Sequence, residues 1–149
     1  MPFLLYIGGI KMIQVYSNGV SVAAGGTYPL NNVTFYKGQT AVQNAVGSIA
    51  LDKKGVYVVQ VDGFGTAAAD GVYSIQLAKN GIPIPQAISA TTAAAASIAS
   101  GSFTTLVTVA QSDCPCNWTT SATNLSIINP EGSADVTEAH INMIVTKLC

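Results

Sequence analysis

The side chains in this sequence that are most able to do chemistry are one histidine, His140, and three cysteines, Cys114, Cys116 and Cys149. A histidine can act as a general base near neutral pH, but catalysis also needs a nucleophile and groups that stabilise developing charge. No spacing in the sequence selects a nucleophile for His140, and a packed strand histidine is the simpler interpretation. The sequence therefore predicts no catalytic residue and no enzymatic activity.

The cysteines leave three interpretations open. Pro115 holds the chain extended between Cys114 and Cys116, so these two thiols are poorly placed for a mutual disulfide. A zinc site would need two further ligands, and the spacing to His140 and Cys149 matches no zinc motif. The alternatives are free thiols, one disulfide (for example between chains through Cys149) and a metal site. Free thiols are the favoured interpretation, and we expect no metal and no cofactor.

Two segments, 62–65 and 70–71, combine aspartate with glycine. Carboxylate and carbonyl oxygens are the ligands of Ca²⁺, but the alternating acidic residues of a calcium-binding loop are absent. Aspartate and glycine are also the usual residues of tight turns. We therefore expect turns at both places.

The composition excludes several classes of partner. Only 9% of the 149 residues are charged, 49% are hydrophobic, the net charge is −1, and arginine is absent. Nucleic-acid binding normally requires clustered basic residues, so we expect no nucleic-acid partner. The apolar run at the N-terminus is shorter than a membrane span, and Lys11 follows it rather than precedes it, so we expect neither a membrane anchor nor a secretion signal.

The order of residue types predicts a chain built almost entirely of strands. Short segments rich in β-branched and aromatic residues alternate with Gly, Asn and Asp turns, without intervening helices. This pattern is typical of a sandwich, jelly roll or barrel. The alanine-rich segment 91–100 is expected to be a loop or irregular strand, with a short helix as the alternative. We expect strands at 12–16, 33–37, 56–61, 72–78, 103–109, 124–128 and 139–148, and breaks at 17–19, 24–26, 52–55, 62–65, 79–81 and 129–132.

Two of the expected strands are apolar on both faces. A sheet wetted on one side should alternate apolar and polar residues, whereas Val56, Val58 and Ile144 lie opposite an already apolar face. A chain of this length cannot cover such a sheet twice, so we expect oligomerisation. The sequence does not say which face forms the core and which the interface; the residues assigned to these two roles together are Tyr57, Val59, Val61, His140, Met143 and Val145.

Three segments resemble the jelly roll of the tumour-necrosis-factor and complement-head superfamily. Residues 55–61 (GVYVVQV) are similar to its central strand, residues 73–85 (YSIQLAKNGIPIP) to a strand and turn, and residues 139–148 (AHINMIVTKL) to its closing strand. The resemblance implies an all-β antiparallel jelly-roll sandwich that assembles as a homotrimer, with a structural or adhesive role. It divides the chain into an N-terminal arm and first strand at 1–19 and a jelly-roll domain at 20–149.

The resemblance is greatest to compact jelly rolls of phage virions, because no collagen-like tract precedes the domain. The expected function is a structural protein of a bacteriophage virion, of the capsid decoration or head-fibre type. Its expected location is the virion surface, after assembly in the host cytoplasm, and its expected partner is the major capsid protein or another virion protein. The residues expected to attach it are Phe3, Leu4, Leu5, Tyr6 and Ile7.

The alternative function is a trimeric head that binds a receptor or carbohydrate, on a phage tail or a bacterial surface. Trp118 is the residue expected to contact a sugar in that case, because sugar faces stack on indole rings. Asn117 and Thr119 flank it in the sequence.

Overall fold

The computed structural model describes residues 11–38, 41–43, 47–109 and 118–148, and for 41–43 and 118–122 it describes the backbone only. These residues form strands and turns, without a helix and hence without a helix that could cross a membrane. The strands are β1 (Met12–Val22), β2 (Thr27–Tyr28), β3 (Asn32–Lys37), β4 (Ala41–Gln43), β5 (Ile49–Lys53), β6 (Gly55–Ala67), β7 (Gly71–Lys79), β8 (Ile82–Ala93), β9 (Ile98–Val109), β10 (Trp118–Ile128) and β11 (Val136–Lys147).

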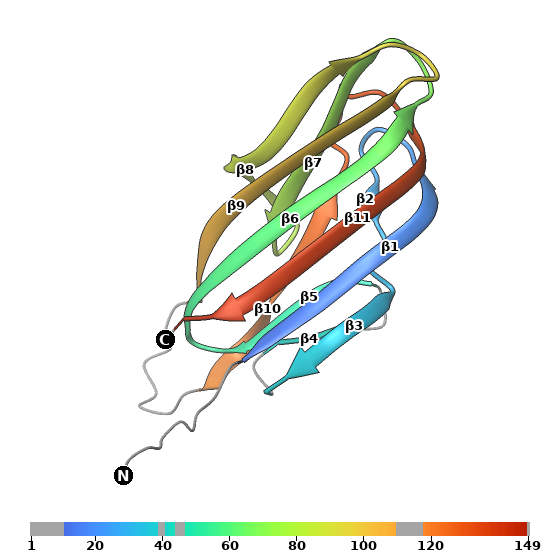
Figure 1. The fold of residues 1–149 in the computed structure, drawn as a ribbon. Helices are drawn as coiled ribbons and strands as arrows, with labels where there is room; N and C mark the ends of the chain where they lie inside the picture. Colours follow the sequence, from blue (N-terminus) through green and yellow to red (C-terminus); the bar gives the residue numbers. More distant parts are fainter. Residues whose placement is uncertain (1–10, 39–40, 44–46, 110–117, 149) are drawn as a thin grey trace.

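The strands form two layered antiparallel sheets (Figure 1). The five-stranded sheet has the order β3-β1-β11-β6-β9, and the second sheet has the order β4-β5-β10-β7-β8, with β2 paired to β10. Strands distant in sequence are therefore neighbours, as in β1 beside β11 and β11 beside β6. The predicted all-β antiparallel jelly-roll sandwich is confirmed.

The core lies between the two sheets, and the long strands β1, β6 and β11 fill it with alternate residues. Three tyrosines, Tyr28, Tyr57 and Tyr73, are fully buried there. The Tyr57 hydroxyl donates a 2.7 Å hydrogen bond to the Lys53 carbonyl, whereas the Tyr73 hydroxyl has no partner among the described atoms. Burial raises the pKa of Tyr73 to about 12, and burial together with the neighbouring Tyr73 raises the pKa of Tyr28.

Two predicted breaks are wrong, because their glycines lie inside strands. Segment 62–65 is the middle of β6, which pairs without interruption with β9 across it. A Cβ at Gly63 would lie 2.5 Å from the Ile141 Cδ1, so this glycine permits close packing and does not make a turn. At 17–19, β1 continues through a bulge in its pairing with β11, where Gly19 has a φ of +67°.

The structure also differs from the expectations at 82–100. β8 is a strand despite Pro83 and Pro85, because it lies at the edge of its sheet, where a missing N–H costs no ladder bond. Its pairing with β7 shifts between Gln76 and Ala78, and the Gln76 amide donates to the Ile84 carbonyl at 3.0 Å. The alanine-rich segment contributes the end of β8, a turn at 94–97 and the start of β9.

The first strand belongs to the jelly roll itself. β1 runs to Val22, so the boundary that we placed after residue 19 falls inside it, and the strand pairs with both β3 and β11. The predicted turns at 24–26, 52–55, 79–81 and 129–132 do separate strands.

Candidate subunit interface

The structure separates the two faces that the sequence left undecided. Tyr57, Val59 and Val61 of β6, with Met143 and Val145 of β11, point into the core and are at most 2% exposed. These five residues therefore pack within one chain. His140, the sixth residue of the set, is half-buried on the opposite, outer face of the five-stranded sheet.

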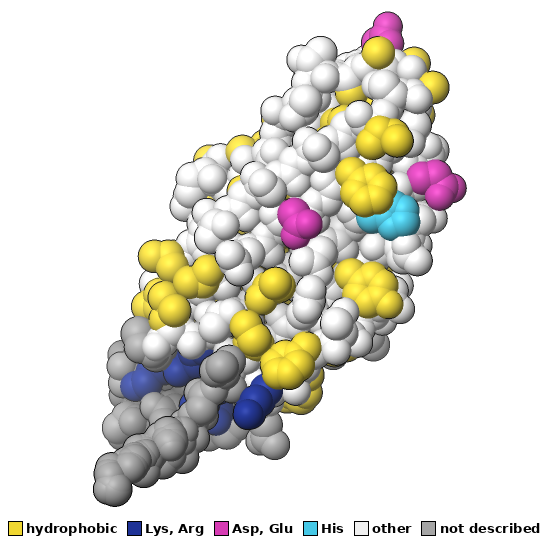
Figure 2. All heavy atoms as spheres, viewed as in Figure 1, with side chains coloured by type: hydrophobic (Ala, Val, Ile, Leu, Met, Phe, Trp, Pro, Cys, Tyr) yellow, Lys and Arg dark blue, Asp and Glu magenta, His cyan; other side chains and the backbone are white. Residues whose placement is uncertain are grey.

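That outer face carries apolar side chains from four neighbouring strands. Val58 and Ile144 are half-buried there, and Val58 is paired with Leu106 of β9, which is 61% exposed. Phe64 of β6 is 45% exposed and Tyr16 of β1 is 37% exposed. Figure 2 shows this face with its hydrophobic side chains distributed over it. The face is therefore a broad, mixed apolar and polar surface and not an isolated exposed residue.

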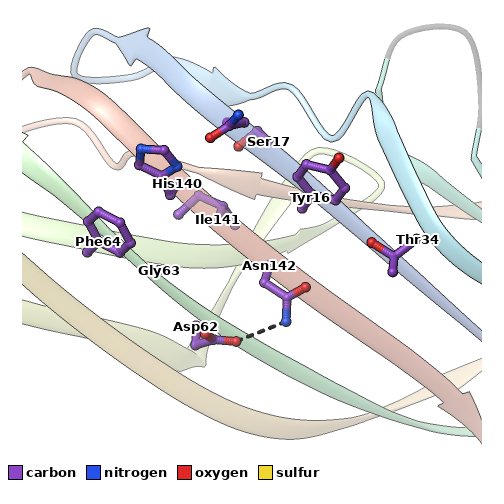
Figure 3. A pocket seen from close by; sticks show the side chains of 10 residues that line it. Tyr16, Ser17, Thr34, Asp62, Gly63, Phe64, His140, Ile141 and Asn142 are labelled. Carbon is purple, nitrogen blue, oxygen red and sulfur yellow. Dashed lines mark hydrogen bonds between the residues drawn. The ribbon is translucent and has the colours of Figure 1, made fainter.

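A row of polar side chains crosses the middle of this face. The Gln14 amide donates to the Asn142 side-chain oxygen at 2.8 Å, and the Asn142 amide donates to an Asp62 carboxylate oxygen at 3.1 Å. The residues come from β1, β11 and β6, so the row joins three adjacent strands. Figure 3 shows the bond between Asn142 and Asp62. We call it the Gln14–Asn142–Asp62 row. It fixes the orientation of the amide groups at the centre of the face.

Beside this row lies a shallow pocket of about 340 Å³. The rings of Phe64 and His140 stack at one side of it, with centroids 4.6 Å apart and an interplanar angle of 18°. Tyr16 and Thr34 lie at the other side (Figure 3). The pocket offers an aromatic surface together with amide and carboxylate groups.

Several predicted site residues lie outside the described part of the chain. This applies to Cys114, Cys116, Cys149 and the attachment residues Phe3 to Ile7, and the side chain of Trp118 is likewise not described. Within the described residues, no group of three or more His, Cys, Asp or Glu side chains could hold a metal ion. Asp70 accepts a 2.7 Å hydrogen bond from the Ala95 amide, which accounts for its carboxylate as a turn-stabilising group.

Sequence reasoning found part of the outer face and missed the rest. It placed Val58 and Ile144 opposite the face that carries Tyr57 and Met143 without deciding which face was the core, and it missed Phe64, because the surrounding glycines predict a turn. The signal was present: Phe64 continues the alternation of Val58, Gln60 and Asp62 once the strand is extended through Gly63. Leu106 is also in alternation, opposite the buried Val107.

The two-sheet antiparallel topology defines a jelly-roll sandwich. No protein-family model matches the sequence, and no curated protein matches it. Solved structures do match it in fold. The globular domain of zebrafish complement 1qA protein has a TM-score of 0.68 at 9% identity, covering 93% of this chain and 98% of that one.

Two further structures extend the likeness beyond the complement domain. The PRD1 vertex protein P5 has a TM-score of 0.64 at 16% identity, covering 95% of this chain and 99% of that one. The Eiger TNF of S. frugiperda has a TM-score of 0.63 at 13% identity, covering 94% and 93%. At these identities the matches establish the fold, which confirms the resemblance seen in the sequence.

Proposed function

We propose that this chain is a non-enzymatic structural protein of a bacteriophage virion, of the capsid decoration or head-fibre type, and that it acts as a homotrimer. The observation that carries the proposal is the outer face of the five-stranded sheet. It presents Tyr16, Phe64 and Leu106 to solvent in a single chain, over half-buried Val58 and Ile144. Several large apolar side chains exposed on one face indicate an interaction site.

A second copy of the chain is the partner that best suits this face. Asp62 is the one charged residue near its centre, and the low charge of the chain gives little repulsion between copies. Most soluble homo-oligomers close by rotational symmetry, which limits assembly to a defined number of copies. The jelly-roll resemblance favours three copies, and the fold shared with the PRD1 vertex protein favours a phage virion as the setting.

Attachment to the virion is assigned to Phe3, Leu4, Leu5, Tyr6 and Ile7. This apolar run precedes Lys11, which lies at the edge of the jelly roll beside the end of β11. The partner would be the major capsid protein or another virion protein at the particle surface. Deleting residues 2–10 is expected to leave a folded trimer that no longer binds shells stripped of this protein. A deletion variant that loses its trimer would contradict this assignment.

The trimer is tested by the mass in solution, measured by light scattering on a sizing column under reducing conditions. We expect about three times the 15.3 kDa of one chain. Leu106→Glu places a charge on the outer face and should shift the mass toward one chain. Ile82→Glu is the matched control, because Ile82 is 69% exposed but lies on β8 of the other sheet. A monomeric parent protein, or a trimer unaffected by Leu106→Glu, would overturn the proposal.

The pocket beside Phe64 and His140 favours a second candidate, a receptor- or carbohydrate-binding head. Aromatic rings next to amide and carboxylate groups suit a sugar ring, which stacks on one face and hydrogen-bonds through its hydroxyls. A glycan array separates the two functions. A structural protein should bind shells and no glycan, whereas glycan binding lost in Phe64→Ala would favour the second function.

A further inference from the structure

Among the described residues, the lysines lie at one end of the protein and most of the acidic residues lie at the other, with Asp62 between the two ends. All six lysines of the chain, Lys11, Lys37, Lys53, Lys54, Lys79 and Lys147, lie at the end where β1 begins and β11 finishes. The pairing shows this directly, because Met12 is opposite both Lys37 and Thr146, and Lys147 is opposite Tyr57. Figure 2 shows the lysines gathered at that end. We call it the basic end.

The opposite end carries acidic residues and no lysine. Asp70 lies in the turn between β6 and β7, while Glu131 and Asp135 lie in the loop between β10 and β11, and Glu138 lies near the start of β11. Asp70 and Asp135 are held by hydrogen bonds from the Ala95 and Ala24 amides, so these turns meet at one place. We call this the acidic end. Asp52 is the one described acidic residue at the basic end.

The two ends act independently toward an approaching surface. β6 and β11 have 13 and 12 residues, so the ends are about 40 Å apart at the usual rise per residue. The Debye length is about 8 Å at physiological ionic strength, which is far shorter. A partner at the basic end therefore experiences the lysines and not the net charge of −1. The net charge of the whole chain therefore does not reflect the positive charge that the lysines place at the basic end.

We propose that the basic end docks on an acidic protein surface and that the acidic end points away from it. This inference rests on the proposed virion role and adds the chemistry of the partner. Apolar side chains stand among the lysines: Phe35 and Tyr36 precede Lys37, and Leu148 follows Lys147, and all three are exposed. Lysines interleaved with exposed apolar residues suit a protein partner that offers carboxylates around an apolar patch.

Other polyanions fit this end less well. A nucleic-acid site usually contains arginine for bidentate phosphate contacts, and this chain has none. The lysines come from β3, β5, β7 and β11, from the residue before β1 and from the turn after β5, so they surround the end of the sandwich and do not follow one strand face. Association with an acidic protein should be fast and strongly salt-dependent, because steering by charge acts mainly on the rate of encounter.

The test uses a charge exchange that leaves the net charge unchanged. Lys37→Glu and Lys54→Glu are combined with Glu131→Lys and Glu138→Lys, which avoids the hydrogen-bonded Asp70 and Asp135. The matched control carries Glu131→Gln and Glu138→Gln alone. Solution mass and circular dichroism establish that each variant folds and assembles as the parent protein does. Binding is measured on a surface of poly-L-glutamate, on duplex DNA, on phosphatidylglycerol vesicles and on stripped shells.

The parent protein and the control should bind poly-L-glutamate at low ionic strength, and the exchange variant should bind at least tenfold more weakly. Binding should also fall as salt rises to about 0.15 M. Equal binding by the parent protein and the exchange variant would overturn the inference, as would tighter binding of the parent protein to DNA or vesicles. Shells that bind the exchange variant normally would overturn it while leaving the virion role intact. Shells that never bind the parent protein would overturn the virion role, whatever the poly-L-glutamate result.

Discussion

The inner and outer faces of the five-stranded sheet are built from alternate residues of the same strands, yet only the inner face is covered within one chain. On β11 the inner residues Ile141, Met143 and Val145 are fully buried within one chain. The outer residues between them, Asn142 and Ile144, are only half-buried, and a polar row crosses between apolar side chains. The inner face is thus completed by folding, whereas the outer face is the surface that we propose for association between copies.

The two faces therefore contribute to two different free energies, that of folding one chain and that of the proposed association between copies. Removing apolar surface from water is worth about 25 cal/mol per Å² in either setting. On the inner face that free energy stabilises the single chain, and on the outer face it would become available only through the association that we propose. Substitutions on adjacent residues of one strand should therefore affect different equilibria. Four substitutions test this, from the largest expected effect to the smallest.

The largest effect is expected for Met143→Ala on the inner face. Met143 is paired with Val15 and Val61 and is fully buried, so its loss leaves a cavity and should cost about 2–5 kcal/mol of unfolding free energy. Ile144→Ala, one residue away on the outer face, should cost much less within a single chain. Urea unfolding at several protein concentrations separates the two. Equal costs that do not depend on concentration would refute the division between the faces.

The next effect is expected for Gly63→Ala, which adds one methyl group to the inner face. Its Cβ would lie 2.5 Å from the Ile141 Cδ1 and 2.7 Å from the His140 carbonyl oxygen. Since that carbonyl belongs to the backbone of the paired strand, it cannot move aside, and we expect a loss of about 1–3 kcal/mol. Gly71→Ala is the control, because its Cβ would make an ordinary 3.5 Å contact with Ala134. Thermal unfolding of both variants measures the difference.

A third effect depends on pH and tests whether water reaches the Tyr73 hydroxyl in the core. The pKa of Tyr73 is raised from 10.0 to about 12, so the neutral phenol is favoured in the folded state. Its contribution is fully present below pH 10 and is lost as pH rises through 12, on the order of 1–2 kcal/mol. The unfolding free energy of Tyr73→Phe should fall less between pH 10 and 12 than that of the parent protein. At pH 7 the two unfolding free energies should be equal, because the hydroxyl has no described partner. An unchanged alkaline profile would show that water reaches this hydroxyl; Tyr36→Phe, at an exposed site, is the control.

The smallest effect is expected for Asn142→Ala in the Gln14–Asn142–Asp62 row. The substitution removes two hydrogen bonds on a face that water reaches, so the unfolding free energy should fall by no more than about 1 kcal/mol. If the outer face is an interface, assembly should weaken more than folding, because Asp62 would be covered without its partner. Sedimentation of the variant over a range of concentrations measures this. A folding loss larger than that of Gly63→Ala would place the row among the groups that hold the single chain together.

The sequence was informative where local pattern and tertiary context agree. The alternation at 56–61 and 139–148 identified both strands and the residues that share each face, because side chains alternate with a period of two, but it did not decide which face is the core. It was also sufficient to separate strands at Asn80-Gly81, where both residues have positive φ. These features depend on neighbours in the chain.

It failed where a glycine or proline has a role that only the partner strand defines. From the sequence alone Gly63 resembles a turn residue, but in the structure its small size is needed because Ile141 lies against it. Pro83 and Pro85 argue against a strand until β8 is known to be an edge. The candidate interface was only partly predictable for the same reason: Leu106 and Val58 are 48 positions apart and become neighbours only through the pairing of β6 with β9.

The prolines of β8 have a consequence for how copies can add to one another. Edge strands invite intermolecular pairing, which leads to domain swapping or fibrils. Pro83 and Pro85 lack the N–H groups that would donate hydrogen bonds to the carbonyls of a neighbouring strand. The register shift beside them also interrupts the ladder with β7. Polymerisation by continuous sheet growth is therefore blocked along this stretch. In a chain with only 9% charged residues, where repulsion between copies is weak, such a block favours a finite assembly over an open-ended aggregate.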